Sequence, residues 1–229
     1  MQATTMLPAD LPLFRAVPPE VLAANSVLRT FRAGEVVFVQ DAPTTGLWVI
    51  LRGRVAMDRM GPDGMEFTTG VHLPGEMVGM VGLWDQSGYP ASGRALDTPT
   101  VLLWMDRERF LALHRTLPEF GLAVSRDLAA RVRYHLESTA DTRGRPAPRQ
   151  VAGFLGILYR RSGADVALTH EELARMLGLR RETVSRVLRS FARQGWVAMR
   201  YGRIRVLDPL ALERVGEASV GAGELESQA

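Results

Sequence analysis

Three charged side chains near the carboxyl-terminal end of the chain, Arg181, Glu182 and Arg186, are the residues best suited to reading nucleic acid. An arginine fork fits the O6 and N7 edge of guanine, and a glutamate accepts a hydrogen bond from the N4 amine of cytosine. At about 100° per residue, all three fall on one arc of a helix. The opposite arc is apolar and can pack on a core; it contains Val184, Val187, Leu188 and Phe191. This pattern predicts a helix that enters the major groove of DNA.

A preceding helix must hold that face in position, and the residues from Leu168 onward carry its signals. Thr169 followed by Glu172 three positions later is the pattern of a capping box at a helix start. Gly178 then suits the turn between the two helices. The segment is typical of a helix-turn-helix. Taken alone, it also fits an amphipathic helical hairpin with a solvated basic face.

The residues after Gly195 favour the DNA-binding interpretation. Residues 196–200 and 203–206 have the composition of two short strands joined by a turn at Tyr201-Gly202. Such a hairpin converts the motif into a winged helix-turn-helix. The wing carries Arg200, Arg203 and Arg205, which can contact phosphate.

Charge is concentrated on the same segment. Residues 149–214 hold 13 Arg and 6 acidic residues, a net +7, whereas residues 1–148 carry −1 and residues 215–229 carry −3. A local positive surplus is the electrostatic footprint of a protein that binds a polyanion. The short acidic end, residues 215–229, is predicted to be disordered.

Residues 28–106 have a different character, with short β-rich runs between Gly and Pro and no helical pattern between them. This arrangement predicts a sandwich or barrel rather than a parallel α/β sheet, and thus an α+β chain overall. Asp63-Gly64 predicts a hairpin turn. Examples of the expected strands are Glu35–Gln40, Gly46–Leu51, Val55–Arg59, Glu66–His72 and Thr100–Met105.

A long helix is predicted after the barrel. Asp106 is expected to cap a helix over 107–116, and Pro118 opens a second helix that runs to about residue 138. Apolar residues recur at spacings near four along it, which can serve packing on its own domain or on the same helix of a second copy. We expect a homodimer, with an interface at Phe120, Val124, Leu128, Val132 and Leu136.

These patterns divide the chain into five segments. We expect a barrel over 1–117, a dimerisation helix over 118–138, a hinge over 139–149 and a winged helix-turn-helix over 150–214, followed by the tail. The hinge is inferred from the Gly, Pro and charge content of its sequence. The second domain is expected to start with a helix whose apolar face contains Val151, Phe154, Leu155 and Leu158.

In this order of elements, and in several motifs, the chain resembles the family of the bacterial cyclic-AMP receptor protein and the fumarate–nitrate regulator (the CRP/FNR family). The resemblance covers roughly residues 11–214. It implies a cyclic-nucleotide-binding-type β-barrel of the double-stranded β-helix or jelly-roll kind, a dimerisation helix and a winged helix-turn-helix, in a dimeric transcription regulator. The shared motifs are Phe31 to Glu35, Gly53 after Val49-Ile50-Leu51, Pro74-Gly75-Glu76, Gly79, Gly82-Leu83 and Gly178 to Arg186.

Carried over by position, the resemblance implies that Arg181, Glu182 and Arg186 read a TGTGA half-site. The expected target is then a palindrome close to TGTGA-N6-TCACA in double-stranded DNA, with half-sites about 34 Å apart. RNA polymerase is an expected further partner. Contacts with the DNA backbone are expected from Thr169, His170, Arg180, Thr183, Ser185, Arg189 and Arg203.

The effector pocket departs from the cyclic-AMP branch. Met80 stands where that branch has a glutamate, and His135-Leu136 replaces two small hydroxyl residues. The branch's Arg-Ser pair falls at Pro90-Ala91, or at Tyr89-Pro90 if one residue is deleted, and neither position supplies a guanidinium. Arg94 is the nearest substitute for the missing guanidinium. Cyclic AMP, another ligand and no ligand all stay open, so no cofactor is assigned. The candidate pocket residues are Gly79, Met80, Gly82, Leu83, Pro90, Ala91, Arg94, His135 and Leu136.

Other classes have little support. The chain has no cysteine, which excludes disulfides, thiolate zinc sites and the cysteine-ligated iron–sulfur cluster of one family branch. The four histidines are scattered without a metal-binding spacing, so neither a metal site nor a catalytic site is predicted and a barrel metalloenzyme is the weakest alternative. No secretion signal or membrane span is predicted, and the expected location is the cytoplasm. An effector-independent regulator with a degenerate pocket is the second candidate.

Overall fold

The computed structural model describes residues 6–62, 64–142, 145–200 and 202–217, with backbone alone at 9, 134, 135, 137–142, 161, 162 and 217. The chain forms two compact units, Met1–Ala130 and Arg131–Ala229. The boundary between them falls inside one long helix, α4 (Pro118–Thr142).

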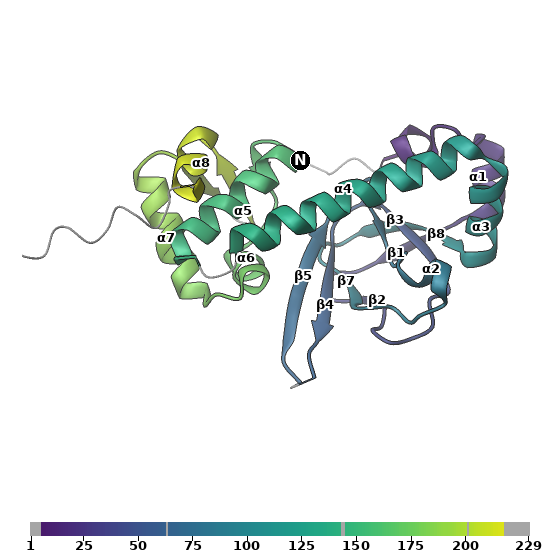
Figure 1. Ribbon diagram of the computed structural model, residues 1–229, viewed down its shortest axis with the longest axis horizontal. Helices are drawn as coiled ribbons and strands as arrows, with labels where there is room; N and C mark the ends of the chain where they lie inside the picture. Colours follow the sequence, from purple (N-terminus) through teal and green to yellow (C-terminus); the bar gives the residue numbers. More distant parts are fainter. Residues whose placement is uncertain (1–5, 63, 143–144, 201, 218–229) are drawn as a thin grey trace, which may run out of the picture. The chain divides into compact units, whose positions relative to one another are not determined.

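The first unit is a sandwich of two antiparallel four-stranded sheets, with strand orders β1-β8-β3-β6 and β2-β7-β4-β5 (Figure 1). Eight strands in two sheets make the expected jelly roll. Its elements are η1 (Pro8–Asp10), η2 (Pro12–Phe14), α1 (Pro19–Asn25), β1 (Val27–Phe31), β2 (Val36–Phe38), β3 (Gly46–Arg52), β4 (Val55–Met60), β5 (Glu66–His72), β6 (Met77–Val78), α2 (Gly82–Asp85), β7 (Ser92–Ala95), β8 (Thr100–Asp106), α3 (Arg107–Thr116) and the first part of α4.

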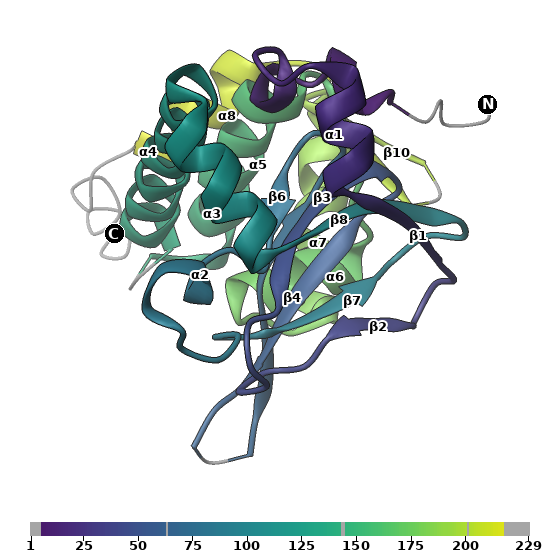
Figure 2. The same cartoon turned by 90° about the vertical axis from the view of Figure 1, so that its right-hand side faces the viewer.

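Strand β3 is buried on both faces, and its alternation separates two cores. Leu47, Val49 and Leu51 point to one side, where they join apolar residues of α1, α3 and α4. Figure 2 shows these helices beside the sheet. Ile50 points to the other side and packs between the sheets with Phe38 of β2 and residues of β4, β6 and β8. The helices therefore seal the outside of one sheet, while a second core fills the interior of the sandwich.

The second unit is a helical domain with a small sheet of order β10-β11-β9. Helix α5 is buried on all sides over residues 154–158, and its buried residues include the four that the sequence placed on one face. Strand β9 adds a third strand to the predicted two-stranded wing. The elements are α5 (Ala147–Ser162), β9 (Asp165–Val166), α6 (His170–Leu177), α7 (Arg181–Arg193), β10 (Val197–Arg200), β11 (Arg203–Val206) and α8 (Pro209–Glu217).

Two predicted boundaries are wrong. The predicted hinge over 139–149 is too long at both ends, and residues 215–217 of the predicted disordered tail are helical. Helix α4 continues to Thr142, and α5 begins at Ala147, with Pro148 in the first turn, where a proline costs no helical hydrogen bond. Helix α8 runs to Glu217, and its start is capped by Asp208, which accepts from the backbone N–H of Ala211 at 2.9 Å. Residues 218–229 of the tail and Asp63 of the predicted hairpin turn lie outside the described residues.

The apolar stripe predicted for α4 is wrong as a single interface. A spacing of four residues advances about 40° per step around a helix, so Phe120 and Leu136 are about 160° apart. Phe120 and Val124 are fully buried in the sandwich unit, and Leu128 packs on the same core. Val132 and Leu136 are exposed by 58% and 68%. Phe120 and Val124 thus belong to the core of their own unit and are not available to a second copy.

We predict that Phe120→Ala lowers the free energy of unfolding of the sandwich by about 3–5 kcal/mol, because it leaves a cavity where the Phe120 ring stacks with Phe14 and meets Phe110 edge to face. Urea unfolding followed by tryptophan fluorescence and circular dichroism measures the change. Leu28→Ala, at a side chain that is 59% exposed, is the control and should stay within about 0.5 kcal/mol of wild type. Equal effects of the two variants would contradict the assignment of Phe120 to the core.

Candidate nucleic-acid interface

The α6–turn–α7 motif has local sequence signals at the start of α6 and at the turn that follows it. Thr169 accepts from the backbone N–H of Glu172 at 3.1 Å, and the Glu172 carboxylate accepts from the backbone N–H of Thr169 at 2.7 Å. This is the predicted capping box. Gly178 has φ of 63°, the left-handed conformation that lets the chain leave α6 and turn into α7. The predicted helix-turn-helix is confirmed as a structure.

Helix α7 presents the two arcs that the sequence predicted. Val184, Val187, Leu188 and Phe191 are buried at 0–7% exposure, against α5, α6 and β10. The opposite arc is exposed and carries Arg181, Glu182, Arg186 and Arg189. Arg193 lies on this arc as well, about 120° from Arg181, and sequence reasoning missed it although the helical period places it there. A hollow beside the wing is lined by Arg186, Arg189, Ala192, Arg193 and Met199.

A polar contact ties the two helices together on this outer side. The Nδ1 atom of His170, the first residue of α6, is 2.9 Å from Oγ of Ser185 on α7. Partial burial, together with the positive charges of Arg181 and Arg189, lowers the pKa of His170 below its ordinary value. Thr183 is half-buried, and Arg180 is exposed at the N-cap position of α7.

The wing carries its arginines on the exposed side of its sheet. Arg203 and Arg205 of β11 are exposed and alternate with the buried Ile204 and Val206. Arg200 of β10 lies directly opposite Arg203. Like charges in such a cross-strand pair destabilise a sheet. Their placement side by side suits a surface that meets an anionic partner.

Aromatic rings occupy part of the sandwich interior. Phe38 and Tyr89 are buried and stacked, with ring centroids 4.3 Å apart. Glycines let these rings approach the backbone: a Cβ atom added to Gly93 would lie 2.7 Å from the Phe38 ring, and one added to Gly79 would lie 3.0 Å from Tyr89. The Tyr89 hydroxyl is 3.3 Å from Thr45 Oγ1. The rings of Phe38 and Tyr89 therefore fill space between the sheets.

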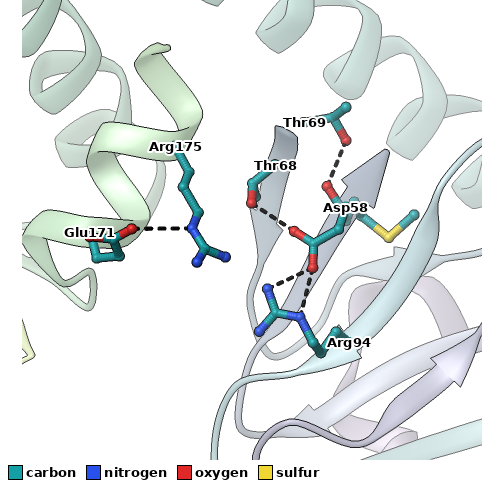
Figure 3. A network of polar contacts seen from close by, with 7 residues as sticks. Asp58, Thr68, Thr69, Arg94, Glu171 and Arg175 are labelled. Atoms are coloured by element: carbon teal, nitrogen blue, oxygen red, sulfur yellow. Dashed lines mark hydrogen bonds and ion pairs between the residues drawn. The ribbon is translucent and has the colours of Figure 1, made fainter. Parts of the chain in front are cut away.

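The Arg94 guanidinium, the predicted substitute for a phosphate-binding arginine, is held within the protein. Its Nε donates to Oδ2 of the buried Asp58 at 2.7 Å, and a second nitrogen is 2.6 Å from the same oxygen (Figure 3). Thr68 donates to the other Asp58 oxygen at 2.6 Å. Arg94 thus neutralises an internal carboxylate, which is a buried charge that needs a partner.

The structure separates the other candidate pocket residues. Met80 and Leu83 are buried in the core beneath the helices, on the other side of the sheet from Phe38. They therefore do not face the sandwich interior, and their assignment to an interior pocket is wrong. Gly82 is pressed against Thr44 and Ser87, while Ala91 packs with Phe38. Pro90 is half-buried, Leu136 is exposed, and the His135 side chain lies outside the described part of the chain.

Within the described residues, no group of three or more His, Cys, Asp or Glu side chains is placed to hold a metal ion. In the same part of the chain, none of the helices combines the length and the apolar content needed to cross a bilayer.

Comparison with known families gives two matches that together cover most of the chain. Residues 28–116 match the cyclic nucleotide-binding domain. Residues 149–215 match the Crp-like helix-turn-helix domain. The two matches coincide with the sandwich and with the unit that contains α6, α7 and the wing.

Two curated relatives match over most of both chains. The cyclic AMP receptor protein of Thermus thermophilus is 34% identical over 212 residues, covering 89% of this chain and 96% of the relative. A CRP-like cAMP-activated global transcriptional regulator of Mycobacterium tuberculosis is 30% identical over 213 residues, covering 88% and 95%. Among solved structures, a CRP-family transcriptional regulator from T. thermophilus matches with TM-score 0.65 at 26% identity, covering 85% of this chain and all of that one. FixK2 from Bradyrhizobium japonicum shares the fold, with TM-score 0.74 at 21% identity over 85% of this chain and 98% of that one.

Proposed function

The chain belongs to the CRP/FNR family of DNA-binding transcription regulators, and from that premise we propose that it binds a TGTGA-like palindrome as a homodimer. Arg181, Glu182 and Arg186 read base edges in this proposal. Thr169, His170, Arg180, Thr183, Ser185, Arg189 and Arg203 contact the backbone, and Arg193 joins them. Contact with RNA polymerase is proposed from family membership alone.

The observation that carries base reading is the rotation of α7. Its apolar arc is fully buried, so the row of guanidinium groups can only face outward. Arg181 and Arg186 lie in the first half of the helix, which is the part of a recognition helix that contacts base edges. Arg189 and Arg193 lie further along, where the helix leaves the groove and phosphate is the nearer partner.

Dimerisation is supported by a second face of α4, distinct from the stripe that the sequence suggested. Heptad spacing returns to almost the same side of a helix, drifting by only about 20°. Two such series are exposed. One contains Leu122, Ala129 and Leu136, and the other starts three residues later and contains Ser125 and Val132. This a/d pattern suits a coiled coil with the α4 helix of a second copy. The proposed interface therefore keeps Val132 and Leu136 and replaces Phe120, Val124 and Leu128 with Leu122, Ser125 and Ala129.

For control of activity, we propose that this chain works without cyclic AMP. Two relatives are cAMP-activated or cAMP receptor proteins by name. In this chain, Phe38 and Tyr89 fill space between the sheets, and Arg94 is paired with Asp58. A cyclic phosphate entering the sandwich would compete with Asp58 for its guanidinium. Gating by an effector is the second candidate function, and it is supported by the match to the cyclic nucleotide-binding domain.

We predict that Arg186→Ala and Arg181→Ala each weaken binding by about 1–3 kcal/mol per half-site of the palindrome and relax preference at one guanine of each half-site. Fluorescence anisotropy on duplexes substituted at each position of TGTGA measures both effects. Arg189→Ala is the matched control. It should weaken binding to all duplexes alike and reduce the slope of log affinity against log salt by about 1 for each protomer, or about 2 for the homodimer. Equal losses on every duplex for Arg186→Ala and Arg181→Ala would sink the base-reading assignment.

A charge placed on the heptad seam, which is the proposed α4 interface, should separate the protomers. Leu136→Glu is expected to weaken dimerisation by about tenfold or more, because an unpaired carboxylate is buried at the interface. Ala130→Glu adds the same charge to an exposed position of α4, off the seam, and should dimerise like wild type. Sedimentation equilibrium distinguishes the variants. If Ala130→Glu disrupts the dimer and Leu136→Glu does not, the heptad seam is on the wrong face.

Titration calorimetry with cyclic AMP, paired with DNA-binding measurements with and without it, tests the effector proposal. We expect no saturable heat and an unchanged DNA affinity, since the guanidinium that would hold the phosphate is bound to Asp58. The T. thermophilus cyclic AMP receptor protein serves as a positive control. Saturable binding accompanied by a shift in DNA affinity would establish gating instead.

A further inference from the structure

His170 is the titratable group placed between the two helices of the DNA-binding motif on their outer side. Its Nδ1 atom is 2.9 Å from Oγ of Ser185, so one polar contact links the start of α6 to the exposed arc of α7. The imidazole is half-buried, and Ser185 is half-buried as well. Arg181 and Arg189, on the same arc as Ser185, are exposed.

Charged groups of both signs surround this imidazole. From α7, the element that packs most closely on α6, the guanidinium groups of Arg181 and Arg189 act on it. From α6 itself come Glu171, which is exposed, and Glu172, whose carboxylate accepts the Thr169 backbone N–H in the capping box. Partial burial and then the two arginines lower the pKa of His170, so the free protein holds it neutral near pH 7.

We propose that His170 takes up a proton when the helix-turn-helix docks on DNA, so that DNA binding tightens as the pH falls. This rests on the proposed DNA contacts of α6 and α7. Phosphates that meet Arg181 and Arg189 offset the positive charges that oppose protonation in the free protein. An anion beside the imidazole also favours its charged form directly. Both effects raise the pKa of His170 in the complex above its value in the free protein.

The contact with Ser185 is compatible with both protonation states. A neutral imidazole can accept from the serine hydroxyl at Nδ1 and donate from Nε2, whereas an imidazolium donates from both nitrogens. A serine hydroxyl can donate or accept, so the pair persists when the proton arrives. The ring therefore stays oriented while its charge changes, and Nε2–H serves as a phosphate donor in either state.

The sign of the pH dependence follows from linkage. A group whose pKa is higher in the complex is protonated on binding, so affinity rises as the pH falls from the higher pKa to the lower one. At most, each histidine contributes about a factor of ten in affinity per pH unit. A homodimer on a palindrome carries two such histidines, which sets an upper limit of about a hundredfold per unit.

The test is the affinity for the TGTGA-N6-TCACA duplex, by fluorescence anisotropy at constant ionic strength, from about pH 5.5 to about pH 8. Wild type should bind about three- to tenfold more tightly per unit of acidification within the window. His170→Gln should flatten this slope, and His170→Arg should bind tightly at every pH. His114→Gln, in the sandwich unit, is the control and should keep the wild-type slope. Calorimetry in buffers of different ionisation heat should show proton uptake by wild type and less by His170→Gln.

The proposal is overturned if His170→Gln keeps the wild-type slope, or if acidification weakens specific binding. Failure of DNA recognition itself has a different signature. At about pH 8, His170 is neutral in the free protein, and wild type should already prefer the TGTGA duplex over a scrambled one. Loss of that preference contradicts the proposed base reading, whereas its presence without a His170-dependent slope contradicts only the proton coupling. Circular dichroism of each variant verifies that the unit is folded.

Discussion

The burial of one arc of α7 is the constraint on which the functional surface depends. Val184, Val187, Leu188 and Phe191 cannot leave the core without exposing large apolar side chains, so the rotation of the helix about its axis is fixed. Every guanidinium on the other arc then faces outward as a consequence. The capping box at Thr169 and the left-handed Gly178 set where α6 begins and where it ends. In the proposed complex, specificity for DNA is therefore a consequence of packing, since the core decides which side chains of α7 can face the groove.

In the sandwich, by contrast, an element with two opposite faces buries both of them. Strand β3 serves two cores, and the interior one holds the stacked Phe38 and Tyr89. A polar network of Asp58, Thr68 and Arg94 adds a satisfied charge pair between β4, β5 and β7. These buried side chains and the Asp58–Arg94 pair support the proposal that the chain works without cyclic AMP, with control of activity located in the DNA-binding unit. His170, between two arginines of α7, is one place where solution conditions can act on that unit.

Elements with strong local signals could be predicted from the sequence. The fold was predicted from the capping box, the paired wing strands and the family motifs. The helical period of α7 predicted which of its faces is exposed. Strands β6 and β9, of two residues each, have too short a pattern to detect. The stripe on α4 was misassigned because a spacing of four drifts around the helix, which places Phe120 and Leu136 on different faces. The Asp58–Arg94 pair joins residues 36 positions apart, and the side of the sheet that Met80 faces depends on the path of the chain, so neither has a local signature.

The most direct test of the account is a crystal structure of the protein with a TGTGA-N6-TCACA duplex. In that structure we expect α7 in the major groove of each half-site, with the guanidinium groups of Arg181 and Arg186 within hydrogen-bonding distance of guanine O6 and N7. A complex in which α7 lies outside the groove, or in which these two arginines contact phosphate alone, would contradict it.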